Sequence, residues 1–265
     1  MELSFDLYQQ GYNIFLLDHR GQGLSERLLS NPHKGYVANF GDYESDLSYF
    51  IDHIVASACP IKPYLLAHSM GGLIAARYLL NKPQSIKAAV LSSPMIGFNS
   101  GPLPSFITKG LIRVTNRLNH WVSDTPWYFL GQKNYQVTPF SQNILSHSKT
   151  RYQHFIELYK NTSDVQLGGV TVHWLAESIK AQNETLRQLE QLSTPIIVLQ
   201  ASEDSVVDNQ AQNYFCQRLN QLQPQSCPKG KPTVIDGAYH ELFIESDTMR
   251  EQALKQIVLW FEQHQ

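Results

Sequence analysis

Short apolar runs along the chain alternate with longer segments in which apolar residues recur every three or four positions. The short runs predict buried strands, and they lie at residues 14–17, 64–67, 88–91, 196–199 and 233–235. The longer segments predict helices, and they lie at residues 43–57, 71–80, 172–191, 210–222 and 247–261. Because strands that alternate with helices form parallel βαβ units, the pattern predicts an α/β fold, with a mostly parallel sheet flanked by helices. Asp42 and Ser246 are the expected N-caps of two of these helices.

The alternation is interrupted at residues 96–169, which are rich in aromatic residues and prolines and lack long β-branched runs. An insertion after a strand of an α/β sheet lies over the carboxyl ends of the strands, where ligands bind. We therefore expect a core made of residues 1–95 and 170–265, with residues 96–169 as a helical cap inserted after the strand that follows the helix at 71–80. An extra helical layer that serves only packing is the alternative.

The segment Ala67-His68-Ser69-Met70-Gly71-Gly72 joins an apolar run to a helical pattern. This context is typical of a nucleophile elbow, a sharp turn between a strand and a helix that exposes one serine hydroxyl. The residues around such a turn must be small, because the strained backbone comes close to its neighbours. Ser69 is therefore the predicted nucleophile. His68 is interpreted as a packing residue at the strand end.

A serine hydroxyl needs a base, and histidine is suitable because its ordinary pKa is near neutrality. In sheet enzymes of this kind the acid and then the histidine follow the serine, each on a loop after a late strand. His240 follows the run at 233–235, with Gly237 to turn the chain, and is the predicted base; capping of the nearby helix is its alternative role. Asp204 is the predicted acid. Of its neighbours, Glu203 is expected to be solvated and Asp208 to cap the next helix.

The segment 18–25, Asp-His-Arg-Gly-Gln-Gly-Leu-Ser, superficially resembles a glycine-rich phosphate loop. It lacks the Gly-Lys-Ser/Thr ending, and no helical pattern follows directly to direct N–H groups at an anion. We expect a structural turn in which Asp18 and Arg20 pair beneath the site.

Composition narrows the functional classes. The chain has 265 residues, is 42% hydrophobic and carries a formal net charge of −2, so no basic field indicates nucleic acid as a partner. Three scattered cysteines predict reduced thiols, with a Cys216–Cys227 bridge as the minor alternative. No metal-ligand spacing suggests a metal or another cofactor. Neither a signal peptide nor an apolar run of about 18 residues is found, which predicts a cytoplasmic protein, with peripheral contact to a membrane as an open alternative.

Taken in order, D-H-R-G-Q-G-L-S, A-H-S-M-G-G, S-E-D-S-V-V-D and G-A-Y-H-E-L resemble the α/β-hydrolase superfamily. The closer likeness is to its monoacylglycerol-lipase-like and serine-aminopeptidase-like branch, and further segments resemble the bacterial inner-membrane lysophospholipases. The resemblance implies a serine hydrolase that cleaves the acyl ester of a lysophospholipid, or another monoacyl lipid, through an acyl-enzyme. By position it implies a triad of Ser69, Asp204 and His240, with the Met70 backbone N–H as one oxyanion donor.

Members of this superfamily begin with three strands before the first helix, and the loop after the third supplies a second oxyanion N–H. Here residues 1–7 already have the pattern of the first helix. We therefore expect the chain to lack those strands, to leave central strand edges unpaired, and to gain esterase activity when upstream sequence is restored. The alternative functions are a monoacylglycerol lipase or general carboxylesterase, and a non-catalytic lipid-binding remnant.

The predicted substrate contacts lie in the cap: Trp121, Trp127 and Phe129 for the acyl chain and Arg151 for the phosphate. Arg113 and Arg117 are the other candidates for the phosphate, and a solvated surface position is the alternative for each of the three arginines. An iminopeptidase would present cap carboxylates to a substrate amine, and this cap is poor in them, with Asp124 and Glu157 as the few candidates.

Overall fold

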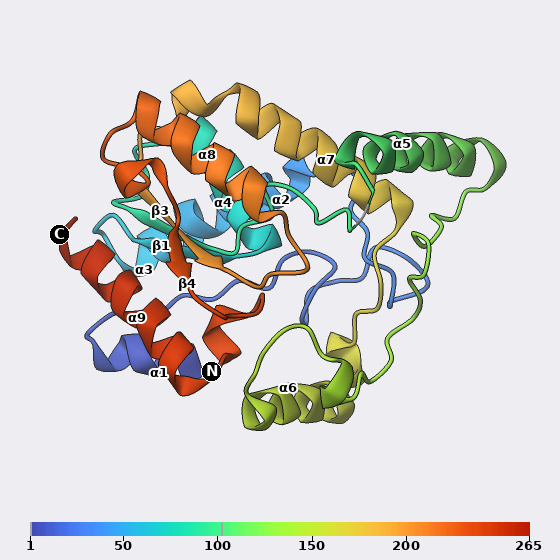
Figure 1. Cartoon of the computed structure of the whole chain (residues 1–265), viewed down its shortest axis with the longest axis horizontal. Coiled ribbons are helices and arrows are strands. Elements are labelled where there is room, and N and C mark those ends of the chain that lie inside the picture. The colour runs from blue at the N-terminus through green and yellow to red at the C-terminus, as the bar shows by residue number, and fades with distance from the viewer. Residues whose placement is uncertain (1, 102) are drawn as a thin grey trace.

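Four strands form one parallel sheet in the described part of this computed structural model, residues 2–101 and 103–265 (Figure 1). Met1 and position 102, which fall within the predicted first helix and cap, lie outside the described residues. The strands lie side by side in chain order, and Leu66, Val90 and Ile197 occupy one row of the register. The strands are β1 (Leu65–His68), β2 (Ala89–Ser92), β3 (Ile196–Ala201) and β4 (Thr233–Ile235).

Helices cover both faces of the sheet, with α1 and α9 on one face and α2, α4, α7 and α8 on the other (Figure 1). The α-helices are α1 (Glu2–Gln9), α2 (Gly41–Tyr49), α3 (Ala56–Ala58), α4 (Met70–Asn81), α5 (Ser105–Val122), α6 (Lys149–Asn161), α7 (Val172–Arg187), α8 (Asn209–Leu222) and α9 (Asp247–Glu262). A π-helical segment, η1 (Phe50–Val55), joins α2 to α3, and the single 3-10 turns are η2 (Phe140–Gln142), η3 (Ser163–Val165), η4 (Leu189–Gln191), η5 (Pro228–Gly230) and η6 (Leu242–Ile244).

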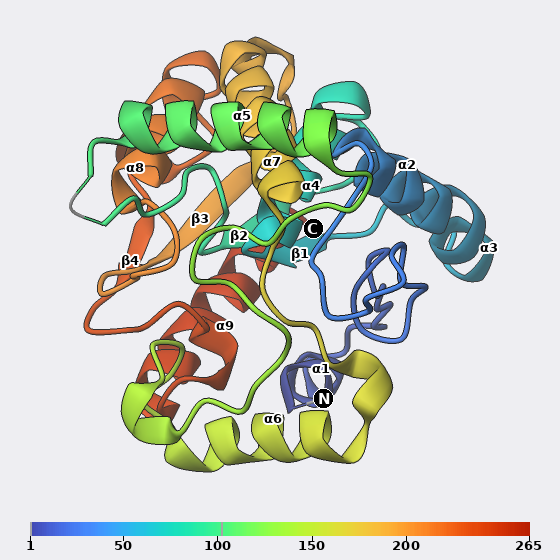
Figure 2. The same cartoon turned by 90° about the vertical axis from the view of Figure 1, so that its right-hand side faces the viewer.

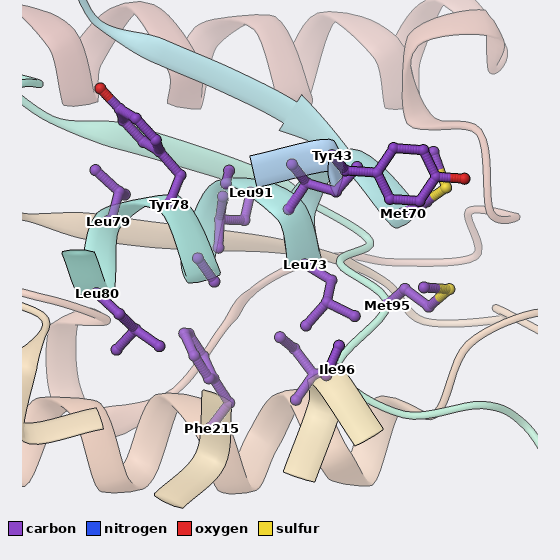
Figure 3. Close-up of a cluster of buried hydrophobic side chains, with 14 of the residues drawn as sticks. Tyr43, Met70, Leu73, Tyr78, Leu79, Leu80, Leu91, Met95, Ile96 and Phe215 are labelled. Atoms are coloured by element: carbon purple, nitrogen blue, oxygen red, sulfur yellow. The ribbon is translucent and has the colours of Figure 1, made fainter. Parts of the chain in front are cut away.

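The strand side chains separate two hydrophobic cores, because successive residues of a strand point to opposite faces. On β2, Leu91 packs toward α4 and α8, whereas Val90 packs toward α1 and α9. Helix α4 lies at the centre of the first core, between the sheet and Phe215 of α8 (Figure 3). Nine of its twelve residues are buried, which is the pattern of a helix surrounded by protein.

The core elements agree with the prediction from periodicity. Strands β1 to β4 and helices α4, α7, α8 and α9 form where apolar runs and helical patterns predicted them, with ends shifted by a few residues. Ser246 precedes α9 at the N-cap position, although its side chain makes no capping hydrogen bond. The side chain of Asp208 caps α8 by accepting the N–H of Gln210.

Two predictions for the first half of the chain are wrong because Arg20 pairs with carboxylates of α2. Helix α2 begins at Gly41 after Phe40, and Asp42 lies in its first turn instead of capping it. Arg20 pairs with Asp42 and Asp46 at 3.2 and 2.6 Å, and not with Asp18. The Asp18 carboxylate instead accepts the N–H of Leu24 and closes its own turn.

The predicted strand at residues 14–17 is also wrong, because this irregular segment has no strand partner among the described residues. Within the same residues β1 pairs with β2 alone. Two neighbouring cavities of about 720 and 440 Å³ are each lined by Phe15 on one side and Leu65 and Leu66 of β1 on the other. A strand requires backbone hydrogen bonds to a neighbour, and here apolar space separates the two segments.

The expectation of reduced thiols is wrong for two of the three cysteines. Cys216 of α8 and Cys227 form a disulfide, whereas Cys59 is free. The turn after α8 brings the two Cα atoms within 5.2 Å of each other, a separation that a disulfide spans.

The segment 96–169 contributes α5 and α6. Figure 2 shows these two helices on the same side of the molecule, with the sheet behind the space between them. Helix α5 packs against α7, and the start of α6 is bonded to the loop before α9. No helix among the described residues is long and apolar enough to cross a bilayer.

Candidate active site

Ser69 lies in the turn between β1 and α4, with φ of 51° and ψ of −117°. A positive φ is strained for a residue with a side chain, and such strain persists only where the surroundings hold it. Here the Ser69 N–H donates to the carbonyl of Ser92, and the Ser69 carbonyl accepts from Met95, both at 2.9 Å. The end of β2 therefore holds the elbow on both sides.

The two glycines after Ser69 have different surroundings. A Cβ at Gly72 would lie 2.7 Å from Cβ and 3.0 Å from Cα of Pro94, closer than packed atoms approach. A Cβ at Gly71 would meet only ordinary contacts at 3.7 Å or more. The elbow therefore requires a glycine at position 72, whereas position 71 has room for a methyl group.

The loops after β3 and β4 are bonded to each other where they carry Asp204 and His240. Gly237, with φ of 70°, turns the chain directly after β4, and its N–H donates to the Ser202 hydroxyl at 2.7 Å. The N–H of Glu203 donates to the carbonyl of Ala238 at 3.0 Å. The carboxyl ends of adjacent parallel strands thus bring the two predicted residues to one place.

Ser69, His240 and Asp204 form a hydrogen-bonded series. His240 Nε2 lies 2.9 Å from Ser69 Oγ, and His240 Nδ1 lies 2.7 Å from Asp204 Oδ2. Both His240 and Asp204 are buried. The second oxygen, Asp204 Oδ1, accepts the N–H groups of Val206 and Val207, which orients the carboxylate.

This arrangement specifies which nitrogen of His240 carries the proton. A carboxylate only accepts, so Nδ1 donates to Asp204 and Nε2 is left to accept the Ser69 hydroxyl proton. The Met70 N–H is among the first N–H groups of α4, which have no partner inside the helix. Of the neighbouring carboxylates, Glu203 is exposed and Asp208 caps α8, as expected for them.

The larger cavity opens at Ser69. Its volume of about 720 Å³ lies within the usual range of roughly 300–1,000 Å³ for small-molecule sites. Its wall is largely apolar and includes Phe98 from the segment between β2 and α5, Ile112 of α5, Phe129 from the segment between α5 and α6, and Trp174 and Ile179 of α7.

The four predicted substrate residues are not gathered in one place. Phe129 lines the cavity. Trp121 is 84% exposed at the end of α5, and Trp127 is partly exposed on the segment that follows. Arg151 forms ion pairs with Glu2 and Asp247, so its guanidinium joins α6 to α1 and α9.

Two further acidic residues of the His240 loop were not singled out in the sequence. Glu241 lies 3.2 Å from Nε2 of His68, the residue before Ser69. Glu245 is fully buried and accepts the N–H of Tyr239 as well as both the backbone N–H and Nδ1 of His147. In the sequence, the two glutamates of His-Glu-Leu-Phe-Ile-Glu (residues 240–245) stand out as acids close to the predicted base. The neighbouring residues do not identify the histidines that these two glutamates contact.

The ligand atoms of His68, His240 and Glu241 lie within 4.8 Å of one another. Both ring nitrogens of His240 already face partners, Asp204 and Ser69, and a metal ion at His240 would break one of these contacts. We therefore assign no metal to this cluster.

The family model described as serine aminopeptidase, S33, matches residues 1–247. The chain belongs to this family. Lysophospholipase L2 of Escherichia coli is 38% identical to this S33-family chain over 267 aligned positions, and the match covers 99% of the chain and 76% of that protein. Human monoglyceride lipase is 25% identical over 250 residues, 94% of the chain and 73% of that protein.

Among solved structures, the monoacylglycerol lipase of Paleococcus ferrophilus matches with a TM-score of 0.75 at 20% sequence identity. The match covers 100% of this chain and 88% of that one. Together with the parallel sheet flanked by helices, this likeness confirms the predicted α/β-hydrolase fold for the S33-family chain.

Proposed function

We propose that the protein is a serine hydrolase that cleaves the acyl ester of lysophospholipids. The observation that carries this proposal is the hydrogen-bonded series Asp204–His240–Ser69 at the opening of a largely apolar cavity. The 38% identity to Escherichia coli lysophospholipase L2 supports the substrate class.

In the proposed mechanism, Ser69 Oγ attacks the ester carbonyl carbon while His240 Nε2 takes the hydroxyl proton. Asp204 holds Nδ1–H and stabilises the imidazolium, and the Met70 N–H donates to the developing oxyanion. Collapse breaks the C–O bond to the glycerol oxygen, which receives the proton from His240. His240 then takes a proton from water as the water attacks the acyl-enzyme carbonyl carbon. Collapse breaks the bond to Ser69 Oγ and releases the fatty acid, and His240 returns the proton to Ser69.

We assign residues 96–169 the role of a cap that contacts the acyl chain. Ile112 of α5 and Phe129 line the cavity that begins at Ser69, so apolar side chains from this segment face the bound chain. Burial of methylene groups stabilises binding by roughly 0.8 kcal/mol each. A long acyl chain therefore supplies much of the binding free energy.

We assign the phosphate contact to Lys109 and no longer to Arg151. Among the described residues that line the cavity, Lys109 of α5 is the one Lys or Arg, whereas Arg151 is held in its ion pairs. In Lys109→Met, KM for lysophosphatidylethanolamine should rise about fivefold, as expected for a partly exposed ion pair of about 1 kcal/mol. KM for monoacylglycerol, which has no phosphate, should not change. Lys180→Met, at an exposed lysine of α7 outside the cavity lining, is the matched control.

We also propose peripheral contact between α5 and a membrane. An exposed apolar stripe runs along this helix at intervals of three and four residues, formed by Ile107, Leu111, Val114, Leu118 and Trp121. Arg113 and Arg117 lie on the same helix and favour anionic headgroups. This surface would bring the cavity opening to its lipid substrate.

The deciding experiment measures fatty-acid release from lysophosphatidylethanolamine, lysophosphatidylcholine and monoacylglycerol under one set of conditions. We expect higher kcat/KM for the two lysophospholipids, and no release by Ser69→Ala. A strong preference for monoacylglycerol would favour the lipase function that the likeness to human monoglyceride lipase supports as the second candidate. A folded protein that a fluorophosphonate does not label at Ser69 would instead be a lipid-binding remnant.

A further inference from the structure

A second pair of ionisable residues lies directly beside the proposed triad. His68 ends β1 and precedes Ser69, and Glu241 follows His240, so each is the chain neighbour of a reacting residue. His68 Nε2 lies 3.2 Å from Glu241 Oε1, and the rings of His68 and His240 are 4.8 Å apart between centroids. Both side chains are mostly covered, with 21% and 31% exposed, and both line the larger cavity.

The surroundings favour the charged form of both groups. Burial by itself lowers the pKa of His68, but the charge of Glu241, 3.2 Å away, and the charge of Asp204 outweigh burial and raise this pKa above its ordinary value. Burial raises the pKa of Glu241, but the nearby charges of His68 and His240 lower it to about 2. At neutral pH Glu241 is therefore an anion that faces a histidine with increased cationic character.

We propose that His68 is a positioning residue whose ion pair with Glu241 keeps that carboxylate from acting as a second counter-ion to His240. The inference rests on the proposed function, because it concerns the base of that same site. His68 thereby balances a negative charge that the sequence places directly after the catalytic base.

The reason lies in the charge change on His240 during the reaction. His240 must be neutral to take the Ser69 proton, and an unbalanced anion within about 5 Å favours its protonated form. The groups that face His240 are Asp204 from the loop after β3, His68 from β1 and Glu241 from its own loop. Asp204 already stabilises the imidazolium through Nδ1, so a second unbalanced carboxylate would make His240 a poor base at neutral pH.

The other titratable groups around the pair leave this balance in place. Tyr159 of α6 lies within range of the Glu241 charge, and the largest effect on it is burial, which raises its pKa and keeps it neutral. His19 lines the same cavity, and burial lowers its pKa, so it is neutral at neutral pH. Ser92 contacts His68 Nδ1 at 3.4 Å and leaves Nε2 directed at Glu241.

The test is the pH dependence of kcat/KM for a neutral p-nitrophenyl ester, whose acidic limb reports the pKa of the free enzyme's base. In His68→Asn, Glu241 is left unbalanced beside His240, and the acidic limb should move to higher pH by about one unit. In the double variant His68→Asn/Glu241→Gln the limb should return close to its wild-type position. Glu241→Gln alone should leave the limb in place or move it to lower pH.

Recovery in the double variant separates charge balance from a merely structural role. If His68 only packs the elbow, removing Glu241 as well cannot restore the limb, and a double variant that resembles His68→Asn overturns the inference. No upward shift in His68→Asn overturns it too. Glu241→Asp, which keeps the charge, should resemble the wild type, and His53→Asn, the same substitution at an exposed histidine, is the matched control.

Failure of the inference is distinct from failure of the proposed function. If the wild-type chain does not turn over the ester and a fluorophosphonate does not label Ser69, the proposed function fails. If the wild type is active and labelled but the limb does not follow the pattern above, only the role of His68 fails. Thermal unfolding of each variant shows whether it is folded. Should His68→Asn not fold, Glu241→Gln and Glu241→Lys replace it: the limb should lie at clearly lower pH in the lysine variant than in the wild type, and the glutamine variant should not move it to higher pH.

Discussion

Helices α4 and α5 both line the larger cavity and both carry many apolar residues, but those of α4 are mostly buried and those of α5 are mostly exposed to solvent. Helix α4 buries nine of its twelve residues, whereas α5 buries Ile112 and Asn119 out of eighteen. The helix behind the nucleophile is enclosed because the strained turn at Ser69 must be held from every side. The apolar stripe of α5 faces outward, where a lipid surface can cover it.

The largest expected difference between the two helices is in turnover. Ser69→Ala, at the start of α4, should lower kcat by roughly 10⁴ to 10⁶, because the nucleophile is lost while the rest of the site remains. Ser105→Ala, at the start of α5 and on the wall of the same cavity, should change kcat by less than about threefold, because the proposed mechanism gives the Ser105 hydroxyl no role. Release of p-nitrophenol from a short-chain ester measures both. Comparable losses in the two variants would contradict the assignment of the nucleophile.

The next difference is in stability. Leu79→Ala removes a fully buried side chain of α4 and should lower the free energy of unfolding by about 2–5 kcal/mol. Leu118→Ala, at an exposed position of α5, should change it by no more than about 0.5 kcal/mol. Urea denaturation followed by circular dichroism gives both values. An equal loss would mean that α5 is as much a part of the core as α4.

A finer comparison lies within α4 itself. Gly72→Ala should destabilise the protein by about 1–3 kcal/mol, because the new methyl group meets Pro94 and the neighbouring backbone must move. Gly71→Ala has room for its methyl group and should stabilise the helix by up to about 1 kcal/mol. The melting temperatures should therefore move in opposite directions. Equal shifts would show that the elbow is not held against Pro94.

The smallest effect is expected on the outer face of α5. Trp121→Ala should weaken binding to vesicles that contain phosphatidylglycerol by about fivefold, because part of one large apolar side chain no longer enters the interface. Its free energy of unfolding should not change. Tyr214→Ala, at an exposed position of α8, is the control for an exposed aromatic residue elsewhere. Co-sedimentation measures the binding, and equal weakening in both variants would argue against a membrane-facing α5.

Local pattern was sufficient for the core of the fold. Short apolar or β-branched runs bounded by helical periodicity predicted β1 to β4 and the helices between them. The signal is clearest for β2 and β3, which are buried along their whole length as strands covered by helices on both faces are. The order Ser69, Asp204, His240 was readable for a related reason. Each of these three residues lies on the turn or loop that follows a predicted strand, and the carboxyl ends of parallel strands meet at one edge of the sheet.

What failed in the sequence-based prediction depended on partners distant in the chain. Residues 14–17 have the composition of a strand but no neighbour to pair with in the described residues. Asp42 has the chemistry of an N-cap but pairs with Arg20, and Arg151 has the charge for a phosphate but is occupied by Glu2 and Asp247.

The sequence by itself determined the class of fold, the strand-turn-helix signal at Ser69 and the candidates for acid and base, because backbone periodicity and turn chemistry act over a few residues. Only the tertiary structure decided which charges face one another. His68 and Glu241 are 173 residues apart in the sequence (241 − 68), yet His68 Nε2 and Glu241 Oε1 lie 3.2 Å apart beside His240. Coulomb interactions depend on distance in space and on burial, and neither can be read from position along the chain.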